Sequence, residues 1–441
     1  MISTQPGWVH FFQYGILALP LAFAGLPLYL HIPDYYIRDM GLSLGAVGIM
    51  LMVLRLLDTV QDPVLGYLSD RWAMRRSVFV YAGSCALLLG MGALLIGPPS
   101  MVQPLFWLGG AMMLASLGLS AISINLNMIG GLWYQDSATR VRLSSWREAS
   151  GLIGLLLAAI LPPVLQRFYS PSESFDVLFF IFSVLFLTSF YCFFRTLKSI
   201  PQDHIIFKEN HERRFFFLPT VFLYEKKFYL ICFLTHLAAS FPAVLFLFFA
   251  RDYLQAGSYS GLFLILYFLS GVLFMPVWSK IARTTCAPNA WLISMGIACL
   301  SFIWAFLLSP GDIVLFAIIC ILSGLALGAD LALPPVILAE KISGHHAEAA
   351  ASQNYALLNL MPKLALAMAS GIAFLVLAYA SFIPGEVNTT QSLFWLTLLY
   401  ALLPSCIKAI AALILWHNLN TKGDYHEHFQ RSHSNGINHV T

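Results

Sequence analysis

The sequence predicts an all-α membrane protein with twelve transmembrane helices in two six-helix bundles. Three observations lead to this prediction. Apolar residues make up 59% of the 441 residues and charged residues only 10%, whereas a soluble domain has about 25% charged residues. The chain holds twelve apolar runs, most of them near or above the roughly 20 residues that a helix needs to cross a bilayer. One long polar stretch, residues 197–227, divides these runs six and six.

The twelve predicted spans follow one another along nearly the whole chain. They are residues 11–32, 42–69, 78–97, 104–133, 148–167, 175–196, 228–250, 259–281, 289–309, 313–338, 351–382 and 394–416. Several are longer than a crossing requires, which predicts tilted or kinked helices. Prolines lie in or near many of them, where neighbouring helices can satisfy the backbone groups that a proline frees.

Four regions follow from this layout. They are an N-terminal six-helix bundle (1–196), a cytoplasmic linker (197–227), a C-terminal six-helix bundle (228–416) and a polar cytoplasmic tail (417–441). Lys and Arg gather in alternate connections, on the side of the linker, and the other side has only Arg38, Arg167 and Arg251. Because positive side chains stay inside, both termini are predicted to be cytoplasmic, in a plasma membrane or a bacterial inner membrane. Each bundle pair encloses a complete path, so a monomer is expected.

Charge and motif content argue against several other functions. The net charge of +3 gives no reason to expect a nucleic-acid partner. Seven scattered cysteines without a CxxC pair indicate packing residues, not a disulfide framework or a zinc site. An intramembrane enzyme needs a nucleophile–base or metal constellation within its spans. No HExxH or paired intramembrane histidines occur, and the one GxSxG match, residues 41–45, begins outside the predicted spans, so neither a catalytic residue nor a cofactor is expected.

The span 42–69 carries three charged residues within eight positions. Asp58 and Asp62 are four residues apart, so both carboxylates project from one helix face, and Arg55 lies on the same side. A charge at membrane depth costs at least about 2.5 kcal/mol on insertion scales and usually marks an ion or substrate path. We therefore expect a site for a monovalent cation at Asp58 and Asp62, with Arg55 as charge partner. A structural Arg–Asp pair with one spare carboxylate is the alternative.

Several motifs, in order, resemble the glycoside–pentoside–hexuronide:cation symporters, the melibiose-permease group of the major facilitator superfamily. They are residues 26–33 (LPLYLHIP) with 41–45 (GLSLG), 57–66 (LDTVQDPVLG) with 70–71 (DR), 136–147 (DSATRVRLSSWR), 328–335 (GADLALPP) and 361–367 (MPKLALA). These matches span both halves of the chain. The resemblance implies the major facilitator fold and cation-coupled transport.

For the cation, the resemblance implies a site on the second span. Asp58 and Asp62 match the family's paired aspartates, which help to bind Na+, Li+ or H+. Ser120 matches a hydroxyl ligand and Gln61 an amide of the melibiose permeases. Lys363 matches a charged residue that faces the cation site, where an ammonium would compete with the cation or hold the carboxylates' charge when it leaves. A snorkelling lysine is the alternative for Lys363.

For the substrate, the resemblance implies contact between Arg147 and sugar hydroxyls, although a positive-inside anchor remains the alternative. The same resemblance implies a cytoplasmic network that latches the inward gate. Its members are Asp70, Arg71, Arg75, Arg76, Arg140 and Arg142.

The carboxylates that grip a galactoside in melibiose permeases are absent from the matching places. Residues 19–22 read LPLA, and Ser123 stands at the position of the second carboxylate. Other polar or aromatic contacts are therefore expected, and these are Ser123, Asn127, Trp133, Asp330 and His236. A helix-packing acid is the alternative for Asp330, and a hydrogen-bonded bundle histidine is the alternative for His236.

The sequence therefore predicts a secondary transporter that couples a cation, Na+ or H+, to the symport of a small solute such as a sugar or glycoside by alternating access. One alternative is the same fold transporting an amphiphile such as a lysolipid or a drug, which the many aromatic residues would suit. The other is a non-transporting membrane enzyme or scaffold.

Overall fold

The structure is a computed structural model that describes residues 8–26, 32, 35–36, 40–72, 76–99, 101–134, 136–199 and 220–421. The chain divides into two compact units. The first unit comprises Met1–Tyr224 and Leu338–Leu360, and the second comprises Glu225–Ile337 and Met361–Thr441. Most of the predicted linker and most of the predicted tail lie outside the described residues, and the predicted domain boundaries stay a prediction.

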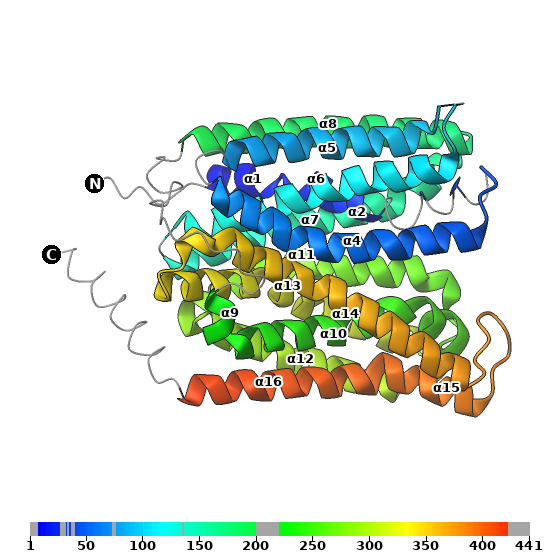
Figure 1. The fold of residues 1–441 in the computed structure, drawn as a ribbon. Coiled ribbons are helices and arrows are strands. Elements are labelled where there is room, and N and C mark those ends of the chain that lie inside the picture. Colours follow the sequence, from blue (N-terminus) through cyan, green and yellow to red (C-terminus); the bar gives the residue numbers. More distant parts are fainter. Residues whose placement is uncertain are drawn as a thin grey trace. The chain divides into compact units, whose positions relative to one another are not determined.

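The first unit is built from helices drawn in blue to green in Figure 1. They are α1 (Trp8–Gly15), α2 (Ala18–Leu26), α4 (Leu44–Arg71), α5 (Arg76–Ile96), α6 (Pro104–Leu132), α7 (Ser137–Leu165), α8 (Pro171–Ser199) and the short α9 (Thr220–Tyr224). Within this unit α6 packs along α5 and α4, and α7 packs along α1 and α2.

Small residues allow these helices to approach closely. Gly15 of α1 lies against the backbone of Trp146 and Arg147 on α7, where a Cβ would come within 2.8 Å of the Trp146 carbonyl carbon. Gly130 of α6 leaves room for the hydroxyl of Tyr14, which would lie 2.0 Å from a Cβ there. These contacts bring α1, α6 and α7 together around one polar region.

The helix α7 begins earlier than hydropathy predicts. The predicted span starts near residue 148, but the helix starts at Ser137, after Asp136. The Asp136 carboxylate caps the helix by accepting a hydrogen bond from the Thr139 amide at 2.9 Å. Hydropathy misses these first turns because they carry three arginines, while the capping aspartate marks the true start.

The second unit holds the remaining long helices. They are α10 (Lys226–Phe248), α11 (Ser260–Thr285), α12 (Ala287–Phe306), α13 (Ile313–Gly344), α14 (Ala351–Tyr379), α15 (Thr390–Thr397) and α16 (Leu403–Thr421). The end of α13 from Leu338 onward and the start of α14 up to Leu360 belong to the first unit. Within the second unit α16 packs along α10 and α12.

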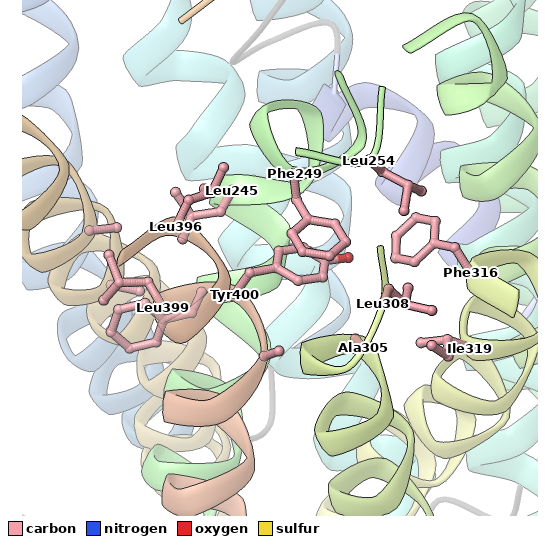
Figure 2. Packing of buried hydrophobic residues seen from close by; sticks show 14 of the residues in the cluster. Leu245, Phe249, Leu254, Ala305, Leu308, Phe316, Ile319, Leu396, Leu399 and Tyr400 are labelled. Carbon is pink, nitrogen blue, oxygen red and sulfur yellow. The ribbon is translucent and has the colours of Figure 1, made fainter. Parts of the chain in front are cut away.

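A buried aromatic cluster forms the core of the second unit. Two π-helical turns, Phe249–Tyr253 after α10 and Leu398–Leu402 between α15 and α16, bring Phe249 and Tyr400 face to face. The two rings are stacked with centroids 4.0 Å apart and planes 7° apart, and Phe316 packs beside them (Figure 2). Such π-helical turns change the direction in which side chains project, which here aligns the two rings.

Ten helical segments in the described part of the chain are long and apolar enough to cross a membrane. The helices α4 and α7 have 28 and 29 residues, so they also have the length of a span. Both carry several charged residues and are the least hydrophobic of the long helices of the first unit. The two most polar long helices of the first unit are therefore the ones on which the sequence places the cation site and the arginine contact.

Candidate transport site

The two aspartates of α4 are buried together with a neutral amide. Asp58 is 8% exposed and Asp62 is 1% exposed, one helical turn apart. The Gln61 side chain between them donates a hydrogen bond from Nε2 to Asp58 Oδ1 at 2.7 Å. The burial of two like charges on one helix is costly, which is typical of a functional site.

Two hydroxyl groups of α6 lie near the Gln61 amide of α4. Nε2 of Gln61 lies 3.4 Å from Ser116 Oγ and 3.4 Å from Ser120 Oγ. Oε1 of Gln61 is buried and has no hydrogen-bond partner within the described residues. The predicted ligands Asp58, Gln61 and Ser120 thus come together between α4 and α6, and Asp62 is buried one turn further along α4. These side chains offer carboxylate, amide and hydroxyl oxygens to a cation.

Two predicted members of the cation site are not tested by this arrangement. The side chain of Arg55 is not among those that the structure describes. Lys363 is half-buried on α14 in the second unit. Their roles as charge partners of the α4 carboxylates stay predictions.

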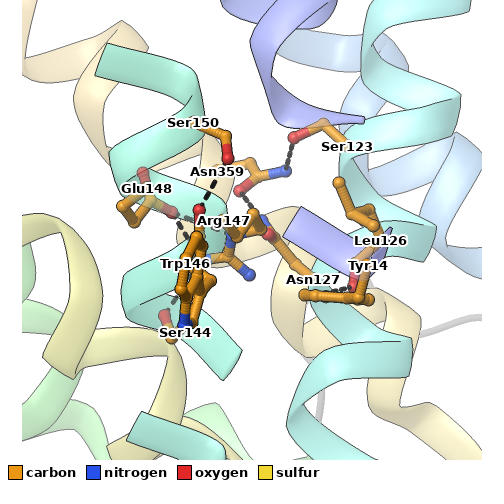
Figure 3. A network of polar contacts seen from close by, with 10 residues as sticks. All are labelled: Tyr14, Ser123, Leu126, Asn127, Ser144, Trp146, Arg147, Glu148, Ser150 and Asn359. Carbon is orange, nitrogen blue, oxygen red and sulfur yellow. Dashed lines mark hydrogen bonds and ion pairs between the residues drawn. The ribbon is translucent and has the colours of Figure 1, made fainter. Parts of the chain in front are cut away.

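A second polar region surrounds Arg147 on α7 (Figure 3). Arg147 is 4% exposed, and its guanidinium donates from Nε and Nη2 to Oε1 of Glu148 at 2.9 Å and 2.5 Å. Nη2 also contacts Ser144 Oγ at 3.3 Å. The Tyr14 hydroxyl donates to the Leu126 carbonyl of α6 at 2.7 Å. Arg147 is thus a buried cation balanced by its neighbour, an arrangement unlike that of a surface anchor.

Asn359 joins two of the predicted substrate contacts. Asn127 donates to Asn359 Oδ1 at 2.9 Å, and Asn359 donates to Ser123 Oγ at 3.3 Å. All three side chains are half-buried and appear beside Arg147 in Figure 3. The start of α14 therefore completes a polar surface that α6 begins.

Aromatic side chains lie next to these groups. Trp133 stacks on Tyr134 with ring centroids 5.3 Å apart and meets Tyr14 edge-on at 6.0 Å. Burial raises the pKa of the Tyr134 phenol, which lies in the connection between α6 and α7 and so keeps its proton at neutral pH. The aromatic residue expected at position 133 therefore lies on the same side of the unit as Tyr14.

Asp70 binds the start of α14. Its Oδ1 accepts from the Ser352 amide at 3.0 Å and its Oδ2 from the Gln353 amide at 2.9 Å. Helix α14 begins at Ala351, so these are first-turn amides that lack a partner within the helix. The positive end of the helix dipole favours a carboxylate there. Asp70 therefore fastens α4 to the end of α14 that belongs to the first unit.

The other predicted gate residues are only partly brought together. Arg140 donates from Nε to the Tyr134 carbonyl at 2.5 Å and lies 3.4 Å from Ser343 Oγ. Glu340 on the same end of α13 accepts from Ser137 of α7. Arg142 is half-buried, without a hydrogen bond or ion pair to any described residue. Arg71 is exposed at the end of α4, and Arg75 and the side chain of Arg76 lie outside the described residues.

Asp330 belongs to a buried network in the second unit. One carboxylate oxygen forms an ion pair with Lys408 of α16, and the other accepts from Trp291 Nε1 of α12 at 3.0 Å. His236 of α10 bonds through Nδ1 to the Cys232 carbonyl at 2.7 Å. Both carboxylate oxygens of Asp330 are used by protein groups, which favours the helix-packing alternative. Contact of Asp330 or His236 with substrate stays a prediction.

The architecture is that of a transporter of the major facilitator superfamily. The crystal structure of a bacterial homologue of the iron transporter ferroportin, in the outward-facing state, has a TM-score of 0.68 at 16% identity and covers 91% of this chain and 99% of that chain. The proton:xylose symporter XylE bound to 6-bromo-6-deoxy-D-glucose has a TM-score of 0.65 at 14% identity, covering 93% and 94%. At such identities the likeness concerns the fold alone, and it confirms the predicted fold class.

The family follows from the sequence comparison. Residues 11–419 match the family described as MFS/sugar transport protein, so this chain belongs to that family, which contains the melibiose-permease-like cation symporters. The uncharacterized symporter YjmB of Bacillus subtilis (strain 168) is 22% identical over 410 residues, 88% of this chain and 86% of its own length. The inner membrane symporter YicJ of Escherichia coli (strain K12) is 28% identical over 181 residues, 39% of each chain.

Family membership confirms the resemblance that the ordered motifs predict. The protein is a multi-pass membrane symporter of the major facilitator superfamily and not an enzyme. A symporter has a substrate and a coupling ion, so both classes of partner follow. Three members of the polar region around Arg147, Tyr14, Glu148 and Asn359, were not expected from the sequence, and neither was Lys408 beside Asp330.

Proposed function

We propose that this protein couples the entry of a sugar to that of a monovalent cation, Na+ or H+. The observation that carries the proposal is the burial of Asp58 and Asp62 one turn apart on α4, beside the Gln61 amide and the hydroxyls of α6. Two neighbouring carboxylates repel each other, and a bound cation relieves that repulsion. Hard cations prefer several oxygen ligands, which this group of side chains supplies.

The polar region around Arg147 is proposed as the sugar site. It combines a guanidinium, a carboxylate, two amides and several hydroxyls with the aromatic ring of Trp133. Sugar hydroxyls both donate and accept hydrogen bonds, so they need such a mixed set. The cation offsets one of the two negative charges of the α4 carboxylates, which lowers the cost of moving the loaded protein between its two states and so couples the two fluxes.

The contact of Asp70 with α14 is proposed as part of the gate. Alternating access requires the substrate path to close on one side while it opens on the other. Asp70, Arg140 and Glu340 connect α4 and α7 to the ends of α13 and α14 within the first unit. We place this group on the cytoplasmic side, together with both termini, because the Lys and Arg residues gather there.

The test is a titration of the intrinsic tryptophan fluorescence of the purified protein with NaCl, with choline chloride as reference. A saturable Na+ response is expected, and Asp58→Asn or Asp62→Asn should weaken the affinity by about 10- to 100-fold, because a charged ligand contributes about 1.5–3 kcal/mol. For H+ coupling, the corresponding result is sugar-dependent alkalinisation outside vesicles, lost in both variants.

Asp176→Asn is the matched control because Asp176 is an exposed carboxylate on α8. A Na+ or H+ response that survives both α4 substitutions would contradict the cation site.

A further inference from the structure

Glu148 supplies a carboxylate next to Arg147 that the family motifs do not assign. Only Oε1 of this carboxylate is used, since both Nε and Nη2 of Arg147 donate to that atom. Oε2 has no hydrogen-bond partner within the described residues. The Glu148 side chain is 22% exposed, whereas that of Arg147 is 5% exposed. The pair therefore combines a partly exposed carboxylate with a buried guanidinium that holds one of its two oxygens.

The pair is electrically balanced. The ionisable groups that act on Arg147 are Glu148, Tyr14 and Tyr355, and both phenols are neutral when protonated. The neighbouring Asn127, Asn359 and Ser123 carry no charge. The local sum is therefore one positive and one negative charge, and the rest of this surface is neutral.

This balance determines which sugars the surface can bind. A neutral sugar can donate one hydroxyl to Oε2 of Glu148 and accept at another from the guanidinium of Arg147, which are both charge-assisted hydrogen bonds. A sugar acid would place a second negative charge beside Glu148 with only one cation to balance the two. In a partly buried place, an unbalanced charge is strongly unfavourable.

We propose that Glu148 is the carboxylate that binds substrate hydroxyls, and that the Arg147–Glu148 pair selects neutral sugars over their C6 acids. This inference rests on the proposed sugar transport. If Glu148 binds substrate hydroxyls, α7 supplies the carboxylate that the first and fourth spans lack.

The experiment measures binding of matched sugars to the full-length protein in detergent with NaCl present. The probes are D-glucose against D-glucuronate and D-galactose against D-galacturonate, which differ only at C6. Trp133 and Trp146 lie beside the site and supply the fluorescence signal. At least one neutral sugar should bind about tenfold or more tightly than its acid. Glu148→Gln should weaken that sugar by about tenfold and abolish or reverse the preference, because Arg147 then has no counter-charge.

Glu148→Asp keeps the charge and should keep the preference for the neutral sugar. Glu386→Gln, in an exposed loop, is the control for loss of a carboxylate, and it should change neither affinity. The inference is overturned if the wild-type protein prefers an acid, a measurement that needs no variant. It is equally overturned if a folded Glu148→Gln protein retains the wild-type ratio. Failure of the proposed function is a different result, in which no panel member binds or is transported with a cation.

Discussion

Two buried aspartate sites, one in each unit, differ in how their charge is balanced. In the first unit, Asp58 and Asp62 place two charges of the same sign on one helix face, next to the neutral Gln61. In the second unit, Asp330 meets the opposite charge of Lys408 and the N–H of Trp291. Like charges favour the arrival of a cation, whereas opposite charges satisfy each other. The difference indicates that the first arrangement is suited to binding and the second to joining helices.

The strongest test of this comparison is the removal of Lys408. Lys408→Met leaves the Asp330 carboxylate buried without its counter-charge, and the protein should lose about 3–5 kcal/mol of unfolding free energy. The double variant Lys408→Met with Asp330→Leu removes both charges and should recover most of that loss. Chemical denaturation in detergent measures both. Equal losses in the single and double variants would mean that the pair does not act as a unit.

A smaller effect is expected at Gln61. Gln61→Leu removes the hydrogen bond to Asp58 and the buried Oε1 oxygen, so cation affinity should fall about tenfold, as expected for one lost hydrogen bond to a charged group. The melting temperature should change little, in contrast to the Lys408 variant. The measurement is the NaCl titration followed by thermal unfolding. A variant that loses stability but keeps its affinity would assign Gln61 to packing.

The smallest effect is expected at Ser120 of α6. Ser120→Ala should weaken cation affinity by only about two- to fivefold, since one neutral ligand contributes about 0.5–1 kcal/mol. Ser84→Ala of α5 is the matched control, because Ser84 is a buried serine whose hydroxyl donates to the Val80 carbonyl of its own helix at 2.7 Å. If the two variants weaken the cation equally, Ser120 has no special role.

Much of the first unit could be predicted from residue spacing alone. The four-residue interval between Asp58 and Asp62 within an apolar run predicts their shared face, and both side chains are buried as that pattern requires. The interval between Ser123 and Asn127 likewise places them on one face of α6, where Asn359 contacts both. Local periodicity contains this information because one helix fixes the relative directions of its own side chains.

The partners across the fold could not be predicted in this way. Tyr14 meets Leu126 across 112 residues and Asn127 meets Asn359 across 232 residues, and no local pattern encodes such pairs. Lys408 is the single charge in a long apolar helix and gives no sign of its partner Asp330. Glu148 follows an arginine at the predicted start of a span. Hydropathy therefore assigns both residues to the polar interface of the membrane and not to a site inside it.

The hydrogen bonds from Ser352 and Gln353 to Asp70 have a consequence for observing the protein at work. These two amides are protected only while α4 remains against the start of α14. Whenever that contact opens, water replaces the carboxylate and the amide protons can exchange with solvent deuterium. The hydrogen–deuterium exchange rates of these two amides therefore report how often this contact opens, and they can be measured without knowing the substrate.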